Sequence, residues 1–163
     1  MPLLCFNNCC SFFLSVILLF ATQAKAQYEE KNFIHYSVKQ GLGENYITCL
    51  QQDKQGYLWI GTDAGLNRFD GYSFKNFHEG TESLPLPSNN IRKLKPFGKD
   101  KTGILSYNGF QLLNSMDLSF HNYTIADSTA FGTQLNAVWD AVQLPNQSSA
   151  VTTASGFHVF KSD

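Results

Sequence analysis

A weak internal repeat is the feature that most constrains what this chain can fold into. Three dipeptides that begin with glycine, at Gly65, Gly109 and Gly156, follow one another at intervals of 44 and 47 residues. Two further sets of residues keep the same intervals. The first set is an Asn followed two places later by an apolar residue, and the second is the middle residue of the next apolar run. These sets are Asn45/Ile47, Asn89/Ile91 and Asn136/Val138, and then Ile60, Ile104 and Val151. Three anchors in register indicate one structural unit that recurs along the chain.

The first of these units shows what each unit contains. Between Asn45 and Phe77, short apolar segments alternate with turns that contain Asp and Gly, as at Asp53–Gly56 and Asp63–Gly65. Short apolar segments separated by such turns are typical of antiparallel strands in a β-meander. The strands are expected at Tyr46–Gln52, Tyr57–Thr62, Leu66–Asp70 and Tyr72–Phe77.

Four strands in a repeat of about 40–45 residues predict the blade of a β-propeller. The expected fold class is all-β, a partial β-propeller of about three four-stranded antiparallel blades preceded by a signal peptide. The expected divisions are a lead-in at 27–44, blades at 45–80 and 81–127, and a truncated third blade at 128–163. Within the lead-in, Phe33–Ser37 repeats the aromatic spacing of Phe74/Phe77 and Phe120/Tyr123. We therefore expect it to be an outermost strand that closes the ring on a partner beyond residue 163.

The first residues are expected to be removed from the mature protein. Residues 11–21 are an apolar run, and Ala24-Lys25-Ala26 supplies the small residues that precede a signal-peptidase site. We place the cleavage between Ala26 and Gln27, which predicts export to the periplasm. The run is too short for a membrane-spanning helix, which needs about 20 apolar residues. The alternative is a buried N-terminal strand.

Composition excludes several classes of function. The net charge is −1 and charged residues make up 15% of the chain, so no basic face for nucleic acid is predicted. After cleavage Cys49 is the remaining cysteine, which excludes an internal disulfide and is read as a small buried residue. The histidines lack metal-ligand spacing, and nothing in the sequence predicts a metal, another cofactor or a catalytic constellation.

The first unit resembles a known family. Four segments are similar to the two-component regulator propeller, found in the periplasmic sensor regions of Bacteroidetes hybrid histidine kinases, and they carry the pattern D-x-x-G-x-L-W-I-G-T…G-L-N-R-[FY]-D. These segments are Tyr36–Leu42, Asn45–Ile47, Gln52–Thr62 and Gly65–Phe74. The second and third units depart from the pattern, since both lack its Trp. The resemblance implies a periplasmic ligand-sensing propeller whose full-length relatives continue with further blades, a sandwich domain, a helix in the inner membrane and a kinase. This chain would be their N-terminal fragment.

Ligands of propellers usually bind at one mouth of the central channel. Here that mouth would consist of the links into each first strand and the turns between second and third strands. The candidate binding residues are Asn45, Asp63, Asn89, Asn90, Tyr107, Asn108 and Asn136. Asn, Ser and Tyr suit a neutral polar ligand, a small molecule or an oligosaccharide, although Asn and Ser also serve simply to make turns.

Two other functions are open at this point. One is a fragment of a secreted propeller enzyme, a lyase or glycosidase, and the other is a protein-interaction propeller. Open blade edges also predict self-association of the isolated chain.

Overall fold

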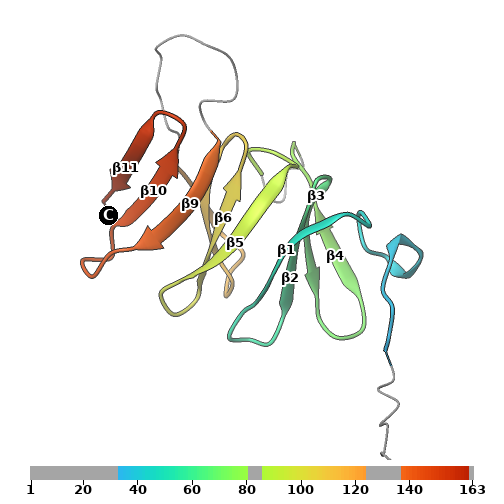
Figure 1. The fold of residues 1–163 in the computed structure, drawn as a ribbon. Coiled ribbons are helices and arrows are strands. Elements are labelled where there is room, and N and C mark those ends of the chain that lie inside the picture. The colour runs from blue at the N-terminus through green and yellow to red at the C-terminus, as the bar shows by residue number, and fades with distance from the viewer. Residues whose placement is uncertain (1–32, 81–85, 124–136, 162–163) are drawn as a thin grey trace, which may run out of the picture. The chain divides into compact units, whose positions relative to one another are not determined.

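The structure is a computed structural model that describes residues 33–80, 86–123 and 137–161. All of its strands lie in the compact unit formed by residues 35–163. The expected signal segment, its expected cleavage site and Asn136 lie outside the described residues. Three antiparallel sheets follow one another in chain order (Figure 1).

The first sheet has the strand order β1-β2-β3-β4. Its strands are β1 (Ile47–Gln52), β2 (Leu58–Thr62), β3 (Gly65–Phe69) and β4 (Phe74–Phe77). The turn chemistry explains this meander, because Gly56 takes the positive φ of 92° that closes the β1–β2 turn. At the β3–β4 turn, the Asp70 carboxylate accepts the backbone N–H groups of Tyr72 and Ser73. The strands expected from the sequence are confirmed here to within two residues at each end.

The second and third sheets repeat this arrangement. The second sheet consists of β5 (Ile91–Phe97), β6 (Lys101–Ser106), β7 (Gly109–Asn114) and β8 (Phe120–Tyr123). The third sheet has β9 (Val138–Gln143), β10 (Ser149–Thr153) and β11 (Gly156–Phe160) as its described strands.

The predicted repeat is confirmed. Gly65, Gly109 and Gly156 each begin the third strand of their sheet, with φ values of 128°, 139° and 136° that side chains rarely adopt. The apolar anchors Ile47, Ile91 and Val138 each begin a first strand.

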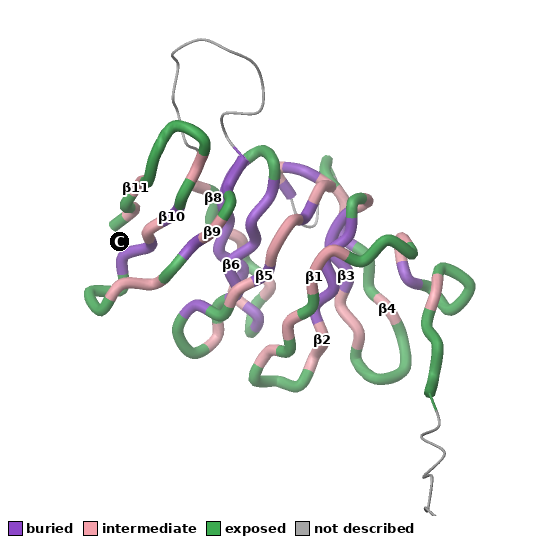
Figure 2. Tube along the Cα trace, in the orientation of Figure 1, coloured by how far each residue is buried: buried purple, intermediate pink, exposed green. Residues whose placement is uncertain are grey.

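The apolar cores lie between the sheets, as the purple segments of Figure 2 indicate. Trp59, Leu66 and Phe77 of the first sheet pack against Ile91 and Ile104 of the second. A second cluster joins the second and third sheets through Phe97, Leu105, Phe110, Val138, Ala141 and Val151. The first strands adjoin one another, β1 beside β5 and β5 beside β9. Trp59 is fully buried and therefore serves packing between blades.

The expected strand at Phe33–Ser37 is not formed among the described residues. Its expected partner lies beyond residue 163, so no strand of the described residues tests the ring-closing role, which stays a prediction. Instead Tyr36 packs its ring on Phe69, with centroids 4.8 Å apart. Ser37 caps a three-residue 3₁₀ helix, η1 (Val38–Gln40), through a capping box with Gln40.

Two asparagines of the first sheet hold the residues after η1. The Asn67 side chain accepts the backbone N–H of Gly43 at 2.9 Å and donates to the carbonyl of Ile60 at 3.3 Å. The Asn76 amide donates to the carbonyl of Gly41 at 3.1 Å. These bonds explain why Asn follows Gly-Leu in the first repeat, because the buried Asn67 joins the lead-in to the sheet.

Candidate functional site

The strand registers bring the predicted binding segments to one end of the sheets. The first residue of each first strand pairs with the last residue of the second strand, as Ile47 does with Thr62 and Ile91 with Ser106. The links into β1, β5 and β9 therefore lie beside the β2–β3, β6–β7 and β10–β11 turns. We call this end the mouth; it lies at the top of Figure 1.

A hydroxyl residue closes the mouth turn in every sheet. The Thr62 hydroxyl donates to the carbonyl of Gly65 at 2.8 Å and accepts the N–H of Ala64 at 3.1 Å. The hydroxyls of Ser106 and Thr153 make the same pair of bonds in the second and third sheets. These residues keep the 44- and 47-residue intervals, so the repeat contained this signal although sequence reasoning missed it. The hydroxyls stabilise the turns, and each donates its one proton within its own turn.

Three of the predicted binding residues use their side chains within the protein. The Asn45 amide oxygen accepts the N–H of Val38 at 3.0 Å. The Asn89 amide oxygen accepts the N–H of Glu79 at 2.6 Å. The Asn108 amide donates to the carbonyl of Pro87 at 3.4 Å. Each of these bonds ties two segments of the mouth together.

The other described candidates differ in their surroundings. Asp63 is exposed at the tip of the β2–β3 turn, and Asn90 is half-buried just before β5. Tyr107 projects its ring from the β6–β7 turn and is 41% exposed. Of the predicted binding residues described here, Tyr107 is the one with a charged side chain over its ring.

A β-bulge recurs at the mouth end of each first strand. The ladder skips one residue between Ile47 and Cys49, and likewise between Ile91 and Lys93. In β9, Thr152 pairs with Asp140 and Thr153 with Val138, so Trp139 is skipped. The skipped residues are Thr48, Arg92 and Trp139. A bulge changes the direction of a side chain and is common next to functional sites.

Two of these bulged residues meet across the second and third sheets. The Arg92 guanidinium lies over the Trp139 ring, with Cζ 4.1 Å from the centroid, and over the Tyr107 ring at 4.6 Å. Arg92 and Trp139 were not predicted from the sequence, because a β-bulge has no characteristic sequence motif. The available signal was their position, each one residue after a repeated apolar anchor.

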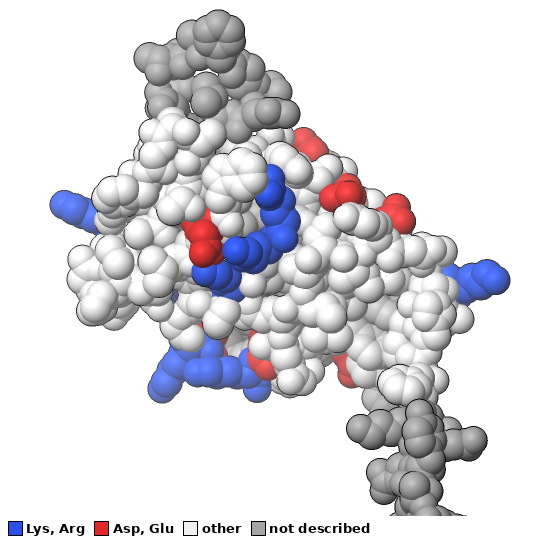
Figure 3. Space-filling model, viewed as in Figure 1, with Lys and Arg blue, Asp and Glu red and all other residues white. Residues whose placement is uncertain are grey.

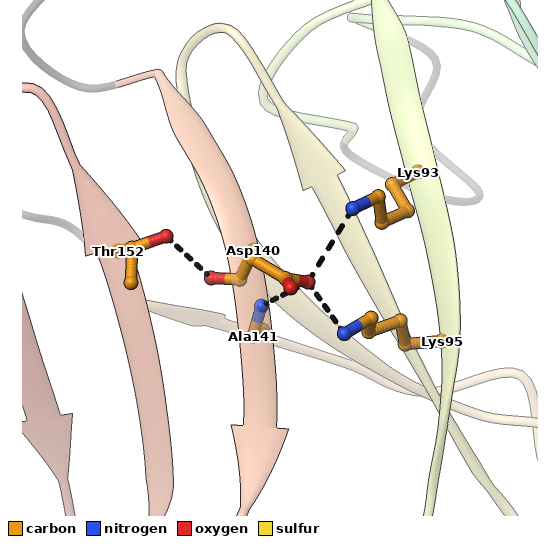
Figure 4. Close-up of polar contacts among 5 residues, drawn as sticks. All are labelled: Lys93, Lys95, Asp140, Ala141 and Thr152. Carbon is orange, nitrogen blue, oxygen red and sulfur yellow. Dashed lines mark hydrogen bonds and ion pairs between the residues drawn. The ribbon is translucent and has the colours of Figure 1, made fainter.

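An ion-pair cluster continues along the same first strands (Figure 4). The Asp140 carboxylate lies 2.5 Å from the Lys95 ammonium and 3.5 Å from that of Lys93. The hydrogen bond from Lys95 is the main reason that the pKa of Asp140 is lowered from its ordinary value. Figure 3 shows Lys and Arg side chains gathered near the middle of the face, beside an acidic group.

A hollow lies at the end of the sheets opposite the mouth. Its volume is about 590 Å³, and Phe97, Lys99, Gln143 and Pro145 are among its lining residues. Turns β5–β6 and β9–β10 form its walls. None of the predicted binding residues contributes to it.

Other kinds of site find little support in the part of the chain that the structure describes. No group of three His, Cys, Asp or Glu residues there could hold a metal ion. Burial raises the pKa of the Cys49 thiol, which disfavours the nucleophilic thiolate. Among these residues, no helix is long and apolar enough to cross a membrane.

Comparisons with known proteins agree with the repeat. The family model described as two-component regulator propeller matches residues 41–64, which run from the lead-in through β1 and β2 to the first mouth turn. "Histidine kinase P4" of Formosa agariphila is 40% identical over 70 residues, which cover 42% of this chain and 5% of that protein. This chain therefore corresponds to a small part of that relative's length.

Solved structures from B. thetaiotaomicron share the fold. The extracellular domain of BT3049, described as a hybrid two-component system, has a TM-score of 0.61 and 22% identity over 78% of this chain and 20% of that one. The extracellular domain of BT4673, described as a one-component system, has a TM-score of 0.63 and 20% identity over 78% of this chain and 18% of that one. The chain thus carries a two-component regulator propeller repeat at residues 41–64, within sheets that form part of a β-propeller.

Proposed function

We propose that this chain is the exported, ligand-sensing propeller region of a two-component regulator and that its ligand is a small molecule or an oligosaccharide. The observation that carries the proposal is the match of the first blade to the regulator propeller, which ends at the mouth turn. The fold shared with extracellular domains of such systems supports a periplasmic location. The remaining blades, the sandwich domain and the signalling parts would belong to the full-length protein.

The mouth supports a binding role for physical reasons. Its backbone is fixed by the hydroxyl turns and by the bonds of Asn45 and Asn89, so the surface is pre-organised. Tyr107 and Trp139 contact Arg92 and are still 41% and 50% exposed, so their rings retain surface that a sugar ring can contact.

Thermal unfolding in the presence of candidate ligands tests this function. The purified full chain is melted with a panel of neutral and acidic oligosaccharides, amino acids and nucleosides. A ligand that binds the folded state raises Tm with its concentration. We expect at least one saccharide of the panel to raise Tm and the other classes to leave it unchanged. Saccharide sensing fails if no saccharide raises Tm; a response to amino acids or nucleosides alone would leave a sensor of another small molecule, and no response from any member of the panel overturns the proposed function.

A further inference from the structure

The bulged residues of the three first strands have different roles. The Thr48 hydroxyl donates to the carbonyl of Ile91 at 2.5 Å, so the first bulge ties one blade to the next. Arg92 also reaches the next blade, but only by stacking on Trp139. This cation–π contact uses the charge of the guanidinium and pairs none of its N–H groups with an oxygen acceptor.

No acceptor within the described residues uses those N–H groups. The ion pairs there join Lys93 and Lys95 to Asp140, and Arg92 forms neither an ion pair nor a hydrogen bond among them. Arg92 is half-buried, and Tyr107 and Trp139 are 41% and 50% exposed. The rings therefore contact the guanidinium at a part-exposed position.

The neighbouring charges favour an anion at this position. Three cationic residues, Arg92, Lys93 and Lys95, stand on β5 against one carboxylate, Asp140 of β9. Because two lysines already contact Asp140, its charge does not neutralise Arg92. A planar guanidinium binds a carboxylate or sulfate through two parallel hydrogen bonds, which a lysine cannot match.

We propose that Arg92, held between Tyr107 and Trp139, is the receptor for an anionic group of the ligand, a carboxylate or sulfate on an acidic saccharide. The inference rests on the proposed function and revises the neutral ligand that the sequence led us to expect. The guanidinium edge binds the oxyanion, and the half-exposed ring of Trp139 contacts the sugar beside it. The site is complete within two adjacent blades, so it is present in this chain.

Tryptophan fluorescence gives a direct readout. The chain has two Trp residues, of which Trp59 is fully buried and Trp139 is half-exposed, so a ligand at the mouth changes the emission of Trp139 alone. The full chain is titrated at low concentration with tri-galacturonic acid and with its fully methyl-esterified form, which has the same rings without the charge. Galactose 6-sulfate and galactose form a second pair, which separates sulfate from carboxylate recognition.

We expect a saturable change with an acidic saccharide and none with its neutral counterpart. Arg92→Ala should weaken binding by about tenfold or more, as expected for loss of a paired hydrogen bond to a charged group. Arg92→Lys keeps the charge and should also weaken binding, because it lacks the planar fork. Lys99→Ala is the matched control, since it removes one positive charge at the opposite end of the same blade and should leave binding unchanged. Trp139→Phe should abolish the signal.

The outcomes separate the inference from the function on which it rests. Equal binding of acid and ester, or an equal loss in Lys99→Ala and Arg92→Ala, overturns the role of Arg92 and leaves saccharide sensing intact. Failure of every saccharide, neutral or acidic, to change either the emission or Tm overturns both. If Arg92→Ala lowers Tm, Arg92→Lys decides, because wild-type affinity in that variant also overturns the proposal.

Discussion

The Asp53 carboxylate accepts the indole N–H of Trp59 at 2.7 Å with one oxygen and the backbone N–H of Tyr57 at 2.9 Å with the other. This carboxylate therefore closes the β1–β2 turn and satisfies the polar atom of a fully buried ring. Asp53→Ala should destabilise the chain by about 1–3 kcal/mol, because a buried donor loses its acceptor. Urea unfolding measures the loss. Asp63→Ala removes an exposed turn carboxylate and should change stability little; equal losses in the two variants would contradict this role of Asp53.

Gly61 marks a close contact between the first two blades. A Cβ at this position would collide with the Cys49 sulfur and would lie 2.7 Å from Cγ2 of Ile91 in the next blade. Gly61→Ala should cost about 1–3 kcal/mol, as overpacking usually does. The control is Thr152→Ala at the same position of the third blade, where the side chain is exposed. If Gly61→Ala is as stable as wild type in chemical unfolding, Cys49 and Ile91 shift to accommodate the added methyl group without a loss of stability.

The Asp140 cluster predicts a small loss of stability in acid. The Lys95 hydrogen bond lowers the pKa of Asp140 from its ordinary 3.8, so its contribution is present above that pH and is lost as the pH falls through the lowered value. The side chain of Asp140 is 49% exposed, and solvent limits the effect to about 1 kcal/mol or less. Stability curves of wild type and Asp140→Asn should differ above pH 4 and converge below it. Parallel curves over the whole range would exclude this linkage.

The isolated chain should self-associate through its third sheet. Phe157 and Val159 of β11 are 72% and 49% exposed, and Phe157 lines an apolar hollow with Val142 and Ala150. Such a surface promotes pairing with a second copy. Size-exclusion chromatography should show oligomers, and Phe157→Glu should reduce them. Tyr72→Ser, at a turn residue that is 95% exposed, is the control. A monodisperse wild-type monomer would contradict the prediction.

Export should produce a mature protein that begins at Gln27. The apolar run at 11–21 and the small residues Ala24 and Ala26 support this cleavage, which lies outside the described residues. Mass spectrometry of the periplasmic fraction should find the chain starting at Gln27 or its cyclised form. Intact Met1 on cytoplasmic protein would refute export and weaken the sensor proposal.

The repeat could be predicted from the sequence because each of its repeated positions is required by the local backbone conformation or by burial. Positive φ demands glycine at Gly65, and burial between sheets demands apolar residues such as Ile104. The ring-closing strand expected at Phe33–Ser37 stays a prediction, because its partner is expected beyond residue 163 and aromatic spacing alone does not reveal that partner. Arg92 and Trp139 escaped prediction for a related reason, since the register that brings them together is a property of the ladder and not of either segment.

At the repeated β-bulge, the strand pairing places few demands on the identity of the bulged side chain. A skipped residue faces no cross-strand partner, so the ladder exerts no selection on its size, charge or polarity. Thr48, Arg92 and Trp139 occupy this position with a hydroxyl, a cation and an indole on the same local register. In the first blade this freedom is already used to join the next blade, since the Thr48 hydroxyl bonds to Ile91, whereas in the second and third blades the same position presents a cation and an indole that the strands beneath do not require.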